Sequence, residues 1–205
     1  MKLNLYQKFL KIKKIKHFMT KLKLTKNGLI IISEEAIAGY IEEQVSSARK
    51  LGDKGSLLEE LKRIERENPD LYEYIERRSG IKALVHRNIH LIGGWKDGAT
   101  STYGIFRFQA IINGQPLFKI TKEAIDNSTL ADLIEIRSST IEDFYMRETK
   151  KIHNSNPVLM NHIMNYNYKD GESIHKGFGM ASLEGAITMH SIYESQARTN
   201  LTQSN

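Results

Sequence analysis

The longest helical pattern in the sequence runs from Ser128 to His153. Its apolar residues recur at spacings of three, four and seven, which places them on one face of an α-helix: Leu130, Leu133, Ile134, Ile141, Phe144, Tyr145 and Ile152. Ser128 is a suitable N-cap, and basic residues near the far end agree with the helix dipole. Arg137 and Ser138 interrupt the apolar face, so the helix either leaves the core there or faces a partner. The pattern predicts one long helix that organises the fold.

Further helices are predicted on both sides of this segment. Ser33 caps a helix that ends at Gly52, and a second helix begins at Ser56. A proline in the first turn opens a third helix, over residues 69–80, and residues 182–198 form the last one. The chain is therefore expected to be rich in helix.

Three segments between these helices resemble strands, because β-branched and aromatic residues dominate them. They cover residues 84–92, 103–112 and 117–120, and Asn-Gly turn signals lie at 113–114 and inside a predicted hairpin at 22–33. No internal repeat is evident. The expected fold class is α+β, with a small antiparallel sheet and several α-helices packed on one face.

The positive charge of the chain is concentrated at its N-terminus. The whole chain has 30 Lys and Arg against 24 Asp and Glu, yet nine of these cations and no acid lie within residues 1–26. The remainder is slightly acidic, with 21 cations against 24 acids. We expect a basic amphipathic extension over residues 1–20, one α+β domain over 21–198, and a frayed tail over 199–205. An anionic partner, such as nucleic acid, is expected to contact Lys8, Lys11, Lys13, Lys14 and Lys16.

This extension allows other interpretations. It could be an organelle presequence, although the absence of Arg and Ser weakens that interpretation, or a helix that lies on a membrane surface. Translation that starts at Met19 would remove most of it. No stretch is apolar and long enough to span a membrane. The chain has no cysteine, which excludes disulfides and thiolate chemistry and fits a cytoplasmic or otherwise intracellular protein.

His86 and His90 are the candidate metal ligands. A spacing of four places the two imidazoles on the same side of a strand or of a helix, where they could share a metal ion with a carboxylate from elsewhere. Lys82 lies on the same face of the predicted strand and would repel a cation. The alternative is that both histidines are exposed on the solvent side of the strand.

The rest of the sequence contains no dense catalytic constellation. His190 and Glu194 share a helix face, so they form either a base with its orienting carboxylate or an ordinary surface pair. No complete phosphate-binding or dinucleotide-binding motif occurs, and no cofactor is implied. We therefore expect a non-catalytic binding or assembly module that self-associates through the helix around Ile141–Tyr145. The alternative is a metal-assisted hydrolase or transferase that uses His86 and His90.

Overall fold

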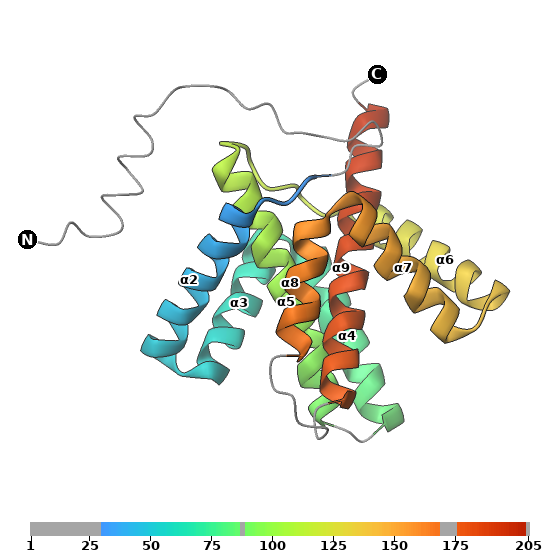
Figure 1. Cartoon of the computed structure of the whole chain (residues 1–205), viewed down its shortest axis with the longest axis horizontal. Coiled ribbons are helices and arrows are strands. Elements are labelled where there is room, and N and C mark those ends of the chain that lie inside the picture. The colour runs from blue at the N-terminus through green and yellow to red at the C-terminus, as the bar shows by residue number, and fades with distance from the viewer. Residues whose placement is uncertain (1–29, 87–88, 169–175, 204–205) are drawn as a thin grey trace, which may run out of the picture.

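The computed structural model describes residues 30–86, 89–168 and 176–203, and within these ranges the chain forms eight α-helices and no β-strand. No helix in the described ranges is long and apolar enough to cross a membrane. Figure 1 shows the helices, which are α2 (Glu34–Leu51), α3 (Asp53–Glu67), α4 (Pro69–His86), α5 (Ile89–Ile112), α6 (Lys122–Ser138), α7 (Ile141–Ser155), α8 (Pro157–Tyr168) and α9 (Lys176–Gln203).

The predicted α+β class is wrong, because the fold is all-α. Segment 84–92 belongs to the end of α4 and the start of α5 wherever it is described, and segment 103–112 lies inside α5. Residues 117–120 belong to the connection between α5 and α6, without a sheet partner among the described residues. The predicted hairpin at 22–33 lies mostly outside the described residues.

The expectation of no internal repeat is also wrong. The first repeat consists of α2–α5 and the second of α6–α9, and α5 packs on α2, α3 and α4 as α9 packs on α6, α7 and α8. Matching residue numbers differ by 88 up to α8 and by 87 in the last helix of each repeat. The matching segments are ISEEAI and ITKEAI (32–37, 120–125), NPDLYEYI and NPVLMNHI (68–75, 156–163), and DGATSTYGIFRFQAIIN and EGAITMHSIYESQARTN (97–113, 184–200).

Both repeats begin with the same kind of helix cap. The Ser33 hydroxyl accepts a hydrogen bond from the backbone N–H of Ala36 at 3.3 Å, and the Thr121 hydroxyl accepts one from that of Ala124 at 3.2 Å. These bonds satisfy backbone donors that a helix start leaves unpaired. Gly52, with a φ of 76°, ends α2, so the predicted bounds of the first helix are confirmed.

A buried asparagine in each repeat fixes the segment that leads into the other repeat. The Asn68 side-chain oxygen accepts from the Ile120 N–H at 2.5 Å, and the Asn156 oxygen accepts from the Ile32 N–H at 2.8 Å. Each asparagine ends one helix, and the proline after it begins the next. The two repeats therefore hold each other through a reciprocal pair of buried hydrogen bonds.

The next backbone N–H in each leading segment bonds to a glutamine of its own repeat. Ser33 donates to the Gln109 side-chain oxygen at 2.7 Å, and Thr121 donates to that of Gln196 at 2.8 Å. Both glutamines are buried, one on α5 and the other on α9. Backbone hydrogen bonds therefore connect the start of α2 and the start of α6 to both repeats.

Helices α5 and α9 pack against each other in the middle of the molecule (Figure 1). A glycine on each helix lets the two backbones come close together. A Cβ atom on Gly98 would overlap the backbone carbonyl of Ser182, and a Cβ on Gly185 would overlap that of Trp95. Ser182 and Trp95 also match each other in the two repeats, so the crossing is symmetrical. The close approach lets the large buried side chains of α5, such as Tyr103, pack between the surrounding helices.

The predicted long helix over 128–153 is two helices. α6 ends at Ser138, and Thr140 starts α7 with a capping box in which Thr140 and Asp143 bond reciprocally. Thr121, rather than Ser128, caps α6. Most residues on the predicted apolar face are exposed, since only Phe144 and Ile152 are buried and Tyr145 is half-buried; the exposed ones are Leu130, Leu133, Ile134 and Ile141.

The helix crossing predicts opposite effects of alanine at two helical glycines. Gly185→Ala is expected to destabilise the protein by about 1–3 kcal/mol, because the new methyl group forces the α5 and α9 backbones apart. Gly80→Ala is the control, since a Cβ at this position of α4 meets no atom within 4 Å. It should stabilise the protein by about 0.5–1 kcal/mol. Urea denaturation measures both, and equal effects would contradict the close crossing.

Candidate functional site

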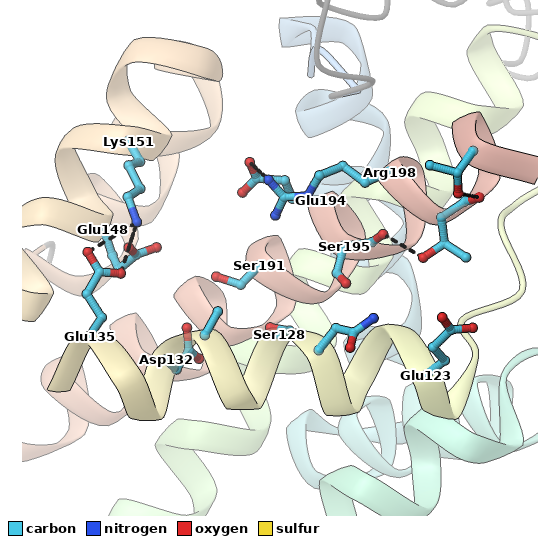
Figure 2. A pocket seen from close by; sticks show the side chains of 14 residues that line it. Glu123, Ser128, Asp132, Glu135, Glu148, Lys151, Ser191, Glu194, Ser195 and Arg198 are labelled. Atoms are coloured by element: carbon cyan, nitrogen blue, oxygen red, sulfur yellow. Dashed lines mark hydrogen bonds and ion pairs between the residues drawn. The ribbon is translucent and has the colours of Figure 1, made fainter. Parts of the chain in front are cut away.

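A polar cavity of about 460 Å³ opens in the second repeat between α6, α7 and α9 (Figure 2). Its lining residues on α6 recur every three or four positions, so a single face of the helix forms one wall. A face of α9 forms the opposite wall, and α7 contributes Glu148 and Lys151 at one end. Ala131 is the one apolar residue that the lining contains, and the others carry hydroxyl, amide, carboxylate or cationic groups.

In the first repeat, two aromatic side chains fill the equivalent space. The Tyr40 ring lies so close to Gly104 that a Cβ there would overlap it, and the Phe108 ring lies 2.9 Å from where a Cβ on Gly39 would stand. These contacts bring α2 and α5 together, and Tyr40 is buried. The first repeat therefore uses this space for core packing.

The second repeat has small polar residues at all four of these positions. Ser128 and Ser195 replace the two aromatic rings, and Asn127 and Ser191 replace the two glycines. All four residues line the cavity. Because a serine occupies much less volume than a tyrosine or a phenylalanine, the exchange leaves a space that the protein's own side chains do not fill.

A buried glutamate forms an ion pair at the same place in both repeats. In the first, Glu60 pairs with Arg63 at 2.8 Å, and in the second Glu148 pairs with Lys151. Both glutamates are buried. This pair belongs to the common scaffold, so on its own it does not distinguish the second repeat.

The surrounding charges do distinguish it. In the first repeat, Arg107 on α5 pairs with Glu43 on α2 and so adds a cation to the cluster. The residue that matches Arg107 is Glu194, which lines the cavity and pairs with Arg198 at 3.1 Å. With this reversal the lining has five carboxylates against two cations, namely Glu123, Asp132, Glu135, Glu148 and Glu194 against Lys151 and Arg198.

Asp132 is the carboxyl group whose ionisation this environment opposes most clearly. Burial, followed by repulsion from Glu148, raises its pKa from 3.8 to about 6, although Arg78 and Lys151 act against the rise. Burial also raises the pKa of Glu148, against the effect of its hydrogen bond with Lys151. The cavity thus holds carboxylates at a cost in folding free energy, which is common at functional sites.

The Ser128 hydroxyl lies unpaired at the wall of the cavity. Its residue is only 5% exposed, and no described residue provides a hydrogen-bond partner for the hydroxyl oxygen. A buried hydroxyl without a partner costs about 1–3 kcal/mol. Ser128 lies four residues before Asp132 on the same face of α6, and its hydroxyl oxygen has almost no surface open to the cavity.

The two predicted metal ligands belong to different helices. His86 is the last residue of α4 and His90 is the second residue of α5, so the single strand that was to align them does not exist. Their side chains lie outside the described part of the structure, and a metal site there stays a prediction. Among the residues that are described, no group of three or more His, Asp or Glu could hold a metal ion.

The other predicted site residues are placed as follows. The five candidate arm lysines precede residue 30 and lie outside the described ranges. His190 is buried, with its Nε2 atom 3.2 Å from the side-chain nitrogen of Asn156, and burial lowers its pKa to about 4. Glu194 instead pairs with Arg198, so neither interpretation of the His190–Glu194 pair holds.

The cavity residues were missed because no single motif marks them. The signal that identifies them is the alignment of the two repeats, in which the positions of Tyr40, Phe108 and Arg107 change character in the second copy. Comparisons of the chain with protein-family models, with curated proteins and with solved structures give no match.

The raised pKa of Asp132 predicts a stabilising substitution. Between about pH 4 and pH 6 the folded state holds a proton that the unfolded state releases, so the stability due to this group falls as the pH rises through that window. Asp132→Asn should therefore raise the melting temperature at pH 7 and have little effect below pH 4. Solvent screening limits the gain to about 1 kcal/mol, or roughly 2–4 °C.

Asp126→Asn is the matched control, because Asp126 is exposed on the same helix and does not line the cavity. It should leave the melting temperature unchanged at both pH values. A lower melting temperature for Asp132→Asn at pH 7 would show that this carboxylate stabilises the fold.

Proposed function

We propose that this protein binds a small, polar, positively charged ligand in the cavity of the second repeat. The observation that carries the proposal is the exchange of the packed aromatic rings Tyr40 and Phe108 for Ser128 and Ser195 within an otherwise similar helical scaffold. A scaffold that needed only stability would gain from filling the second space as it fills the first. The excess of carboxylates selects a cation.

The test fills the cavity with an aromatic side chain and compares ligand binding with that of the wild-type protein. The double variant Asn127→Gly/Ser195→Phe recreates the contact between Gly39 and Phe108 in the second repeat. Melting temperatures are measured with putrescine, arginine, glucose and citrate. We expect at least one cationic compound to raise the melting temperature of the wild-type protein, since a ligand at 100 times its Kd stabilises the folded state by about 2.7 kcal/mol. The double variant should show no such shift.

Leu201→Phe is the control variant, because it adds an aromatic ring at an exposed position of α9 outside the cavity. It should keep the ligand response of the wild-type protein. Circular dichroism verifies that each variant is folded. An equal shift in the wild-type protein and in a folded double variant, or no shift with any of the compounds, would contradict the proposal.

The basic N-terminal segment supports a second proposed function, the binding of an anionic polymer. Residues 1–26 contain nine cations and no acid, whereas the rest of the chain is slightly acidic. Binding of the full chain to duplex DNA should weaken steeply between 50 and 200 mM salt, as about six or more phosphate contacts would require. Deletion of residues 1–18 should abolish it. Full affinity after this deletion would overturn the proposal.

Self-association through the helix around Ile141–Tyr145 stays a prediction. Ile141 is exposed on α7, and Tyr145 is half-buried between two cavities. These positions leave the start of α7 accessible, which the prediction requires. A monomeric mass at high protein concentration would contradict it.

A further inference from the structure

The cavity of the second repeat is elongated. Its lining residues on α6 extend from Glu123 to Glu135, and on α9 from Ser191 to Thr202. At 1.5 Å per residue these helix segments span about 18 Å and about 16 Å. A volume of about 460 Å³ spread along such walls forms a channel-like space that suits a thin, extended molecule better than a compact ring.

Negative groups lie toward both ends of this space. Figure 2 shows Glu135 and Glu148 at one end of α6, with Asp132 beside them, and Glu123 at the other end. Glu194 faces the same space from α9. Glu135 and Glu148 already pair with Lys151, so a ligand that complements this distribution carries positive charges for Asp132 at one end and Glu123 at the other.

The middle of the cavity is lined by hydrogen-bonding groups. Ser128, Ser191 and Ser195 lie between the charged ends, and the Ser128 hydroxyl is buried without a partner. Hydroxyl oxygens accept hydrogen bonds from amine N–H groups. The middle of the ligand can therefore carry a nitrogen that donates to the hydroxyl oxygens of Ser191 and Ser195.

One end already shows how an ammonium group is held there. The Lys151 ammonium lies 3.1 Å from a Glu135 carboxylate oxygen and also pairs with Glu148. Asp132 lines the same end, and no described residue forms an ion pair with it. Asp132 is thus positioned to accept hydrogen bonds from a second ammonium group, which would come from the ligand.

From these observations we infer that the ligand is a linear polyamine, with Asp132 holding one terminal ammonium group and Glu123 attracting the other. This inference rests on the proposed function of the cavity. Primary and secondary ammonium groups have only N–H donors, which match carboxylates and hydroxyl oxygens. A neutral sugar would leave the carboxylates to repel one another. Inorganic divalent cations lack a set of three converging ligands among the described residues.

Isothermal titration calorimetry of the full chain with spermidine tests the inference. Putrescine is the shorter polyamine, MgCl₂ supplies charge without shape, and decalysine represents a cationic peptide. We expect spermidine to bind at least about tenfold more tightly than putrescine and MgCl₂. Asp132→Asn should weaken spermidine binding about tenfold, whereas Asp126→Asn should leave it unchanged. The refilled variant Asn127→Gly/Ser195→Phe should not bind spermidine.

The other possible results contradict either the polyamine inference alone or the proposed function as well. If spermidine binds Asp132→Asn or the refilled variant as tightly as it binds the wild-type protein, then it binds by charge outside the cavity and the inference is wrong. Preferential binding of decalysine would replace the polyamine with a cationic peptide. If spermidine fails while arginine stabilises the wild-type protein and not the refilled variant, the polyamine inference falls and the proposed function stands. If no compound distinguishes these two proteins, the proposed function fails as well.

Discussion

The close contact between α5 and α9 is the constraint on which the rest of the structure depends. Gly98 and Gly185 let the two backbones approach until the carbonyls of Trp95 and Ser182 occupy the space of a side chain. The helices that surround each of them are then placed by symmetry, so that Asn68 and Asn156 reach the backbone of the opposite repeat. A longer side chain at the crossing would move both asparagines away from their partners at once.

The two repeats share a helical scaffold but use the equivalent space between its helices differently. The first repeat fills the space between α2, α3 and α5 with aromatic rings and links the helices with the Arg107–Glu43 pair. The second leaves the equivalent space open and puts Glu194 where the first has Arg107. Stability gained in the first repeat and at the crossing offsets the unfavourable carboxylates of the second, because both repeats belong to the same core.

Local signals in the sequence predicted parts of this fold well. Ser33 and Gly52 bound α2, and Pro69 begins α4, because capping and proline chemistry act over only a few residues. The strand predictions failed in α5 because this helix is central: residues around its circumference are buried, so its apolar residues form no stripe, and its aromatic and β-branched composition resembles a strand. The apolar stripe across α6 and α7 caused the opposite error. Its spacing indicated a buried helix face, but Leu130 and Leu133 are exposed. The cavity could not be predicted from either repeat alone, because it arises from the difference between them.

A crystal structure of the full chain at a resolution that shows ordered solvent tests the central claim most directly. That claim is that side chains fill the space between the helices of the first repeat, and that the equivalent space in the second repeat is open. We expect Tyr40 and Phe108 to be packed in the first repeat, and solvent or a bound molecule to lie beside Asp132 and Ser195 in the cavity of the second. A structure in which α6 closes onto α7 and α9, with no space beside Asp132, would contradict the claim.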